Sequence, residues 1–379
     1  MAKLKIKLAR NLRRSMMRGH PWVYKDSLVS PGPIDRAQIC QVLDQKDEIG
    51  WGFYDPHSVL ALRILSLTKA PPSKVFFEKQ FARAYELRRG VRSAATNAYR
   101  LFNGEGDCLP GLVCDIYADT AVLQFDGQGP SEFWDRELVK NWLLENTACS
   151  RVIEKLRGQK EQVFDSPEVA ILENNIKFKI NLEKGQKTGF FLDQRNNREY
   201  IRHVSAGKSV LNLFSYTGGF SVYAGLGGAK RVASLDISKG ALELAEENWA
   251  LNGLDKSIHT SLCVDVFEYL RGNAELWDHI IVDPPSMTHS KETKEAAVAK
   301  YTEIFAAAAK RVCPAGELSL SSCSSHISFD DFFKIIEEAL SVARRRGQIL
   351  RVSGQGADHP FPHACPELRY LKFVHLALD

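Results

Sequence analysis

The chain has 379 residues, 44% of them hydrophobic and 25% charged, which is the composition of an ordinary globular protein long enough for two or three domains. It has no apolar run of the roughly 18 residues that cross a bilayer, and its start, MAKLKIKLAR, lacks the apolar region of a secretory signal, so we expect a cytosolic (cytoplasmic) protein with no membrane contact. Eight dispersed cysteines without a C-x-x-C pair exclude a dense disulfide framework.

Basic residues gather at the start of a chain whose net charge is only +4. Residues 1–25 hold eight lysines or arginines and no acidic residue. In KLKIKLA the lysines alternate with leucine and isoleucine, which predicts a strand with one buried face and one cationic face. Such a face is typical of nucleic-acid binding, and a solvated terminus that only aids solubility is the alternative. The basic residues are Lys3, Lys5, Lys7, Arg10, Arg13, Arg14, Arg18 and Lys25.

Short strand and turn signals continue to about residue 68, in QICQVLD, IGWGFYD and ALRILSL. They predict a small β-rich domain over residues 1–70. The prolines of KAPPSK then stop regular structure, and a helical pattern, VFFEKQFARAYELRRGVR, opens a second segment. Further strand signals and the helical pattern EFWDRELVKNWLLE predict a central α+β domain over residues 75–182. We expect its arginines to contact phosphates, with ordinary surface charge as the alternative; they are Arg83, Arg88, Arg89 and Arg92.

From residue 186 onward, strand and helix patterns alternate. The strand patterns are SVLNLFS, RVASLDIS, HTSLCVD, WDHIIVDPP and ELSLSSCSS, and each precedes a helical stretch. Repeated βα units predict an α/β fold with a mostly parallel, doubly wound, Rossmann-like sheet that binds its ligands at the carboxyl ends of the strands. We therefore predict a third domain over residues 186–379, with its chemistry where the strands end.

The first three strand ends suit a bound nucleoside. The first leads into Gly218 and Gly219 at the start of a helix, where a ligand can approach the backbone closely, without the G-x-G-x-x-G or phosphate-loop patterns of NAD and ATP sites. The second ends at Asp236, about 20 residues further on, where an acid can accept both ribose hydroxyls. The third ends at Asp265, which can accept an adenine amino group while Val266 packs on the ring. For each acid, the alternative is to cap the next helix.

The fourth and fifth strand ends carry residues suited to catalysis. IIVDPPSM places Asp283 before two prolines, which lack backbone donors and keep the acid from capping a helix. LSLSSCSSHIS places Cys323 at the end of the neighbouring strand, facing the same crevice. A zinc site at Cys323 and His326 would need two further ligands, and no second pair stands at suitable spacing. A thiol packed in the core is the plainer alternative to a nucleophile.

These strand ends resemble the motifs of class I S-adenosylmethionine-dependent RNA methyltransferases, through LNLFSYTGGFSVYA, ASLDIS, CVDVF, IIVDPP and SLSSCSSH in this order. More narrowly, they resemble the large-subunit (23S) rRNA cytosine-C5 methyltransferases whose bacterial members carry an N-terminal PUA domain. The resemblance covers nearly the whole chain, through RRSMMRGHPWVYKDSL, RLFNGEGDCLPGLVCD, KTGFFLDQRNNR, ADHP and CPELRYLK. It departs at Ser286 and Met287, where the family commonly has a lysine and an aromatic residue, and this bears on recognition of the target base.

The resemblance implies methylation of C5 of an rRNA cytosine, with S-adenosylmethionine as the methyl donor. The thiolate of Cys323 would add to C6 of the ring, C5 would attack the methyl group, and Asp283 would share a proton at N3. Unpaired or flipped rRNA is the expected partner, because a stacked base cannot reach such a pocket, and a homodimer is compatible with the resemblance. The implied cofactor contacts are Gln194, Asn212, Phe214, Tyr216, Gly218, Asp236, Ile237, Asp265, Val266, Asp283 and Pro284.

The sequence leaves several alternatives open. A uracil-C5 methyltransferase also uses a strand-end cysteine and an acid followed by two prolines. A catalytically silent RNA-binding or ribosome-assembly factor is a different class, and the altered residues Ser286 and Met287 are its support. His326 either tunes Cys323 or has a local capping or packing role. The base that removes the C5 proton and the nucleotide that is modified are not identified.

Overall fold

In the computed structural model, the described residues are 4–156, 164–183, 185, 188–288 and 292–379. Within these ranges the chain folds into two compact units, and neither is one continuous stretch. The first unit comprises Met1–Leu172, Asn181–Leu192 and Ala357–Leu368, and the second comprises Glu173–Ile180, Asp193–Gly356 and Arg369–Asp379. The boundaries of the three expected domains stay a prediction. No helix in the described part of the chain is long and apolar enough to span a membrane.

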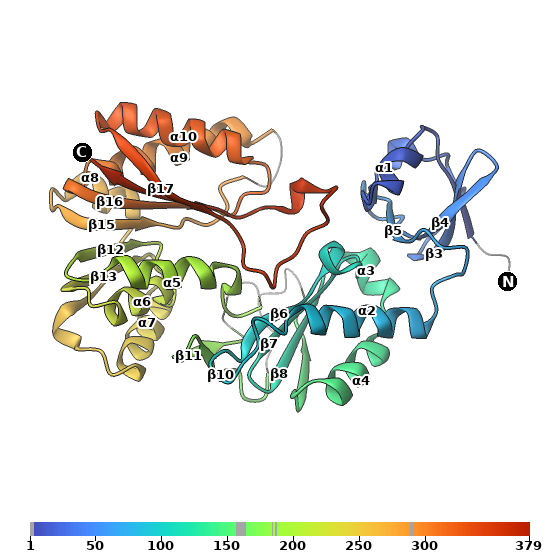
Figure 1. Ribbon diagram of the computed structural model, residues 1–379, viewed down its shortest axis with the longest axis horizontal. Helices are drawn as coiled ribbons and strands as arrows, with labels where there is room; N and C mark the ends of the chain where they lie inside the picture. Colours follow the sequence, from blue (N-terminus) through green and yellow to red (C-terminus); the bar gives the residue numbers. More distant parts are fainter. Residues whose placement is uncertain (1–3, 157–163, 184, 186–187, 289–291) are drawn as a thin grey trace. The chain divides into compact units, whose positions relative to one another are not determined.

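The N-terminal sheet of the first unit begins with the alternation expected from its sequence. Ile6 and Leu8 are buried and Lys5 and Lys7 are exposed, whereas Lys3 lies outside the described residues. In the described ranges the strand order is β1-β3-β4-β5-β2, with β1 parallel to β3 and the other neighbours antiparallel. The elements are β1 (Leu4–Lys7), α1 (Arg13–Met17), β2 (Trp22–Val23), η1 (Lys25–Ser27), β3 (Gln38–Asp44), β4 (Asp47–Tyr54) and β5 (Leu62–Ser66) (Figure 1).

A second sheet with three helices continues the first unit. Its strands, as far as the structure describes them, have the order β6-β7-β8-β9. Phe53 of β4 stacks on Phe133 of α3 with ring centroids 4.4 Å apart, so the two sheets share one hydrophobic core despite the prolines between them. The elements are α2 (Lys74–Leu87), β6 (Ala98–Asn103), η2 (Gly104–Asp107), β7 (Leu112–Tyr117), β8 (Thr120–Phe125), α3 (Gln128–Phe133), α4 (Arg136–Asn146) and β9 (Arg151–Glu154), followed by β10 (Glu168–Glu173) and β11 (Ile176–Asn181) where the chain passes into the second unit.

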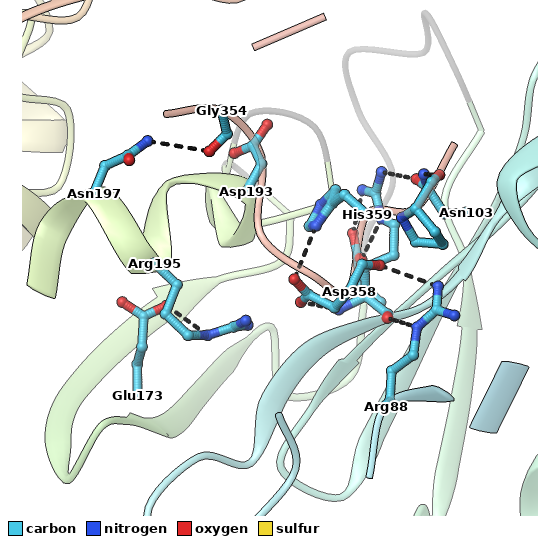
Figure 2. A network of polar contacts seen from close by, with 12 residues as sticks. Arg88, Asn103, Glu173, Asp193, Arg195, Asn197, Gly354, Asp358 and His359 are labelled. Carbon is cyan, nitrogen blue, oxygen red and sulfur yellow. Dashed lines mark hydrogen bonds and ion pairs between the residues drawn. The ribbon is translucent and has the colours of Figure 1, made fainter. Parts of the chain in front are cut away.

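The segment Ala357–Leu368 completes the first unit around a buried ion pair. Arg88 follows α2, is fully buried, and donates two hydrogen bonds of 2.6 Å to the carboxylate of Asp107. Its Nη2 also donates to the backbone carbonyl of Asp358 at 3.0 Å (Figure 2). The Asp358 carboxylate accepts from the backbone N–H of Arg100 at 3.1 Å. The expectation that Arg88 contacts phosphate is therefore wrong, because its donors are buried and used within the protein.

The second unit is built on a doubly wound sheet with an antiparallel edge. Among the described strands the order is β14-β13-β12-β15-β16-β18-β17, parallel from β14 to β16 as the βα alternation predicts. β18 is antiparallel to both neighbours, and the sequence analysis does not anticipate it or β17. The elements are η3 (Leu192–Gln194), α5 (Arg195–Val204), β12 (Ser209–Leu213), α6 (Gly219–Leu226), β13 (Arg231–Asp236), α7 (Lys239–Leu251), η4 (Lys256–Ile258), β14 (His259–Cys263), α8 (Val266–Gly272), β15 (Trp277–Val282), α9 (Lys294–Ala309), β16 (Val312–Ser322), α10 (Phe329–Ala343), β17 (Gly347–Ser353), η5 (Pro366–Leu368, in the first unit) and β18 (Lys372–Leu378).

Helices cover both faces of this sheet (Figure 1). Apolar residues of α8, α9 and α10 join alternate residues of β12, β15 and β16 in one hydrophobic core. Helices α5, α6 and α7 lie on the other face. Each helix that follows a parallel strand begins near the carboxyl end of that strand, so these ends and their loops form one edge of the unit.

Candidate active site

The carboxyl ends of four parallel strands meet at this edge. Leu213, the last residue of β12, pairs with Leu235 of β13 and with Val282 of β15. Val282 in turn pairs with Leu320 of β16. From β12 the chain continues through β13 and β14 on one side of the sheet, and then through β15 and β16 on the other side. The carboxyl end of β12 is therefore the switch point, where doubly wound sheets bind ligands. The residues that end or follow these strands are Phe214, Asp236, Asp283 and Cys323.

The loop from β12 to α6 has an uncommon backbone. Phe214 and Tyr216 have φ values of 58° and 49°, in the left-handed region, and Gly218 has a φ of 77°. For a bulky residue this conformation costs roughly 1–3 kcal/mol, and such residues occur in tight turns and cluster at functional sites. The carboxylate of Asp236 helps to hold the loop, because its Oδ2 accepts a hydrogen bond from the backbone N–H of Tyr216 at 2.9 Å. The strained loop and the end of β13 therefore form one connected element.

Gly218 is explained by packing within the protein. A Cβ atom at this position would lie 2.8 Å from the Cβ of Ala245 in α7, and the φ of 77° also favours glycine. A ligand is expected to approach the backbone closely here, and α7 occupies the side toward which a Cβ atom would point. A cofactor contact at Gly218 stays a prediction and would use its backbone.

Asp236 and Ile237 place a carboxylate beside an exposed apolar side chain. Asp236 accepts a second hydrogen bond at Oδ1, from the backbone N–H of Ser238 at 2.9 Å, and each oxygen keeps a lone pair for another donor. The Ile237 side chain is 73% exposed, which is uncommon for a large aliphatic residue. A ribose could donate to the carboxylate while its base covers the isoleucine, so the two residues fit a nucleoside.

Three of the predicted cofactor contacts have other roles in the fold. Asn212 is 1% exposed within β12, and its amide donates to the hydroxyl of Ser221 at 2.9 Å. Val266 is 3% exposed and packs in the hydrophobic core, so the expectation that its side chain packs on an adenine ring is wrong. Oδ1 of Asp265 caps α8 by accepting from the N–H groups of the two residues after Val266, at 2.8 and 3.0 Å. The capping alternative thus holds for this oxygen.

Asp283 is held by a buried network of amides. Gln194 is 3% exposed, and its Nε2 donates to Oδ1 of Asp283 at 2.9 Å. Its Oε1 accepts from Nδ2 of Asn197 at 2.6 Å, and Oδ1 of Asn197 accepts from the Ser353 hydroxyl at 2.7 Å. This chain of donors and acceptors leaves Gln194 one orientation, with its NH₂ group toward the carboxylate. Gln194 therefore orients Asp283, and Pro284 beyond it is buried.

Cys323 is partly exposed at the end of β16, between two fully buried serines. The Ser322 hydroxyl donates to the Tyr301 hydroxyl at 3.1 Å, and the Ser324 hydroxyl lies 2.9 Å from the same Tyr301 oxygen. Ser286 lies 3.1 Å from Ser324 through their hydroxyls, and this joins the loop after β15 to the loop that carries the thiol. Hydrogen-bonded neighbours thus hold the backbone of Cys323 on both sides, and the departure at Ser286 is part of that frame.

Lys372 is a charged residue of this site that the sequence analysis misses. It is fully buried, and its Nζ donates to the backbone carbonyls of Ser324 at 2.6 Å and Tyr370 at 2.8 Å. Burial lowers the pKa of Lys372 to about 8, and interactions with Cys323 and Asp331 oppose this shift. A cation near a thiol stabilises the thiolate. The available signal was a lone lysine in the apolar stretch YLKFVHLAL.

The first unit carries the expected cationic surface. Arg10 pairs with Asp26 at 3.1 Å and Arg13 with Asp47 at 2.8 Å, and such exposed pairs are weak enough to exchange for phosphate. Arg92 stacks over an aromatic ring, 3.6 Å from the centroid of Tyr85. The predicted phosphate contacts that are exposed are Lys5, Lys7, Arg10, Arg13, Arg14, Arg18, Lys25, Arg83 and Arg89.

Two family profiles match this sequence. The profile of an S-adenosylmethionine-dependent methyltransferase family matches residues 147–346, which include the four strand ends. The profile of a PUA-like domain matches residues 6–67, which include the N-terminal sheet.

Curated relatives and solved structures match over almost the whole chain. The ribosomal RNA large subunit methyltransferase of Deinococcus radiodurans is 33% identical and aligns with 100% of this chain and 98% of its own. Ribosomal RNA large subunit methyltransferase I of Aeromonas salmonicida is 35% identical, with 97% of each chain covered. A SAM-dependent methyltransferase structure from Streptococcus mutans has a TM-score of 0.86 at 26% identity and covers 99% of this chain and 100% of that one. The methyltransferase SMU.776, complexed with S-adenosylhomocysteine (SAH), has the same TM-score and identity and covers 100% of both chains.

Proposed function

This chain belongs to the family of S-adenosylmethionine-dependent ribosomal RNA large subunit methyltransferases, and on that premise we propose that it methylates C5 of a cytosine in large-subunit (23S) rRNA. Its cofactor is S-adenosylmethionine. The observation that carries the C5 assignment is the partly exposed thiol of Cys323, at the end of the strand next to the one that leads to Asp283. Methylation of an amino group needs no such nucleophile, whereas C5 of a pyrimidine does.

Cys323 and Asp283 are the proposed catalytic residues. The thiolate of Cys323 adds to C6, forming a sulfur–carbon bond and moving an electron pair of the ring toward C5, while Asp283 shares a proton with N3. The bound cofactor would supply its sulfonium methyl group to C5 and leave as S-adenosylhomocysteine, with the sulfur–methyl bond broken as the C5–methyl bond forms. Loss of the C5 proton to a base then expels the thiolate and restores the aromatic ring.

Two buried residues are proposed to position this pair. Lys372 is the cation beside the thiol, and it favours the thiolate both before addition and after expulsion. Gln194 holds one oxygen of Asp283 at 2.9 Å, which fixes the carboxylate plane relative to the crevice. Lys372 acts through Cys323, and Gln194 acts through Asp283. Substitution of either residue should therefore change the rate of methyl transfer and its dependence on pH.

The cofactor is proposed to lie across the ends of β12 and β13. The carboxylate of Asp236 accepts hydrogen bonds from the ribose hydroxyls of the cofactor, and the Ile237 side chain covers its adenine. The backbone from Phe214 to Gly218 faces the amino-acid portion of the cofactor. The left-handed loop, the carboxylate and the 73% exposed isoleucine support this placement. Asp265 and Pro284 stay proposed contacts, the acid through the oxygen that does not cap α8.

An unpaired or flipped cytosine of rRNA is the proposed substrate, since only an unstacked base can reach the thiol. The cationic face of the PUA-like domain, with Lys5 and Lys7 exposed, supports phosphate contacts whose strength should fall steeply with salt. A homodimer is compatible with this proposal, and sedimentation analysis would decide it.

Substitution of Cys323 by alanine tests the covalent mechanism. We expect Cys323→Ala to lose methyl transfer to deproteinised rRNA and to keep its affinity for S-adenosylmethionine, because the proposed cofactor residues lie on other strands. Asp236→Ala is the reciprocal control and should weaken cofactor binding in calorimetry. Full activity of Cys323→Ala would exclude the thiol as the nucleophile.

Mass spectrometry of rRNA nucleosides from a deletion strain identifies the base. Loss of one 5-methylcytidine supports the proposal. Loss of a 5-methyluridine would assign the enzyme to uracil instead. Unchanged rRNA, together with tight rRNA binding by the purified protein, would favour a catalytically silent assembly factor.

A further inference from the structure

Three metal-ligating side chains meet inside the second unit, away from the strand ends. His279 of β15 pairs in register with Glu317 of β16, and His375 lies on the adjacent strand β18. Both histidines are fully buried and the Glu317 side chain is 18% exposed. Nδ1 of His279, a carboxylate oxygen of Glu317 and Nε2 of His375 all lie within 4.8 Å of one another.

The three converging atoms are Nδ1 of His279, Oε2 of Glu317 and Nε2 of His375. Among the described residues none of them has a hydrogen bond of good geometry, although Nε2 of His375 lies 3.4 Å from Oε2 of Glu317. The opposite nitrogen of each ring is occupied, since Ser319 Oγ lies 2.9 Å from Nε2 of His279 and 2.8 Å from Nδ1 of His375. A serine hydroxyl has one hydrogen, so it can donate to at most one of the two rings. A ring that instead donates its own N–H to Ser319 in the neutral form presents a bare lone pair to the cluster. A buried acceptor of this kind calls for a ligand or a water molecule.

We propose that His279, Glu317 and His375 bind one divalent transition-metal ion, with Zn²⁺ the best match. Two imidazoles and one carboxylate are a ligand set that zinc prefers, with ligands at about 2.0–2.1 Å and hence about 3.4 Å apart in a tetrahedron. Oε2 of Glu317 lies 3.4 Å from Nε2 of His375 and 3.9 Å from Nδ1 of His279, and the two ring nitrogens lie within 4.8 Å of each other, so the ligands have to move closer together to reach the tetrahedral spacing. Ser319 can accept an N–H from both rings at once, which leaves both lone pairs toward the ion.

The surroundings of Glu317 orient its carboxylate toward the two rings. Lys208 Nζ lies 2.6 Å from Oε1 of Glu317 and so directs Oε2 toward the rings. The positive charge of Lys208 also opposes the binding of a metal cation at this site. The ion therefore needs all three ligands, His279, Glu317 and His375, to bind.

The expected role of the ion is to tie strands together. His279 stands four residues before Asp283, or about 13 Å along an extended strand. The ion would be too distant to touch the reacting base. It would join β15, β16 and β18, the strands that carry or lead to Asp283, Cys323 and Lys372. Metal binding should therefore raise the melting temperature more than it changes the chemical step.

Titration of the untagged, chelator-treated full-length protein with Zn²⁺ and Co²⁺ tests the site. We expect one equivalent to bind in calorimetry, a higher melting temperature, and a visible Co²⁺ spectrum of four-coordinate type without the near-ultraviolet band of thiolate ligation. Glu317→Gln keeps the side-chain size and removes the charge, and we expect it to lower affinity by more than about 100-fold, since even second-shell changes cost 10–100-fold. The matched control is His203→Gln, which removes a 69% exposed imidazole of α5 and should leave binding unchanged.

Several results would overturn the proposal. They are absence of binding to the wild type, equal binding by Glu317→Gln, and a thiolate band in the Co²⁺ spectrum. If Glu317→Gln does not fold, anomalous scattering at the zinc edge from crystals of the Zn²⁺-treated wild type decides. An ion between the three residues supports the proposal, and a water molecule there refutes it.

Discussion

Replacement of Lys372 by methionine tests whether the buried cation supports the reaction of Cys323. Methionine keeps much of the volume of the lysine stem and removes its charge. In the wild type, Nζ donates to two backbone carbonyls and burial lowers the Lys372 pKa to about 8. At pH 7, one unit below this pKa, about nine-tenths of the Lys372 side chains are protonated. Cys323 therefore has a positively charged neighbour at neutral pH.

The substitution should slow methyl transfer and weaken the fold. A neighbouring cation favours the charged form of an acid by about 1–3 pKa units, so the thiolate fraction and the rate near neutral pH should fall roughly 10- to 1000-fold. Each carbonyl that loses its buried donor costs roughly 1–3 kcal/mol, so the free energy of unfolding should fall by about 2–6 kcal/mol.

Single-turnover methyl transfer from labelled cofactor, measured against pH, is the assay. The deficit of Lys372→Met should be largest near neutral pH and shrink as the pH rises through about 8, because the wild-type lysine then loses its own proton. Lys310→Met is the control, since this exposed lysine at the end of α9 should leave the profile unchanged. A folded Lys372→Met enzyme with the wild-type rate and pH profile would refute the reasoning.

Two further predictions concern stability. Arg88→Met leaves the carboxylate of Asp107 buried without its cation, so the free energy of unfolding in urea should fall by about 3–5 kcal/mol. Adding Asp107→Asn should recover part of the loss because a neutral amide is easier to bury. Burial lowers the pKa of His259 from 6.5 to about 4. The residue therefore has no effect on the free energy of unfolding above pH 6.5 and lowers it as the pH falls from 6.5 to 4. The total loss is roughly 3 kcal/mol. His259→Gln should flatten that part of the melting-temperature profile, and an unchanged slope would contradict the prediction.

Features encoded by local periodicity were predictable from the sequence. The alternation in KLKIKLA is enough to expose Lys5 and Lys7 and bury Ile6. The βα alternation places Asp283 and Cys323 at the ends of neighbouring strands, because parallel strands joined by helices share one carboxyl edge. Such patterns need no knowledge of distant contacts.

Features that depend on distant partners were not predictable. Arg88 looks like surface charge until Asp358, 270 residues away, closes over it. Val266 and Gly218 are explained by the core and by α7, which no motif reports. His326 forms no hydrogen bond or ion pair with the described residues, so neither tuning of Cys323 nor capping gains support.

The discontinuous first unit has a consequence for how the protein is made. Ribosomes deliver the residues up to Leu192 early, but Asp358 only after all of Asp193–Gly356. Until then Nη2 of Arg88 lacks one of its acceptors, the carbonyl of Asp358, and the backbone N–H of Arg100 lacks the Asp358 carboxylate. N-terminal domains usually complete their fold first during translation, whereas this one must wait for nearly the last codons. A chain released early would therefore expose an unfinished N-terminal half to proteases, which gives the cell a means to discard truncated copies.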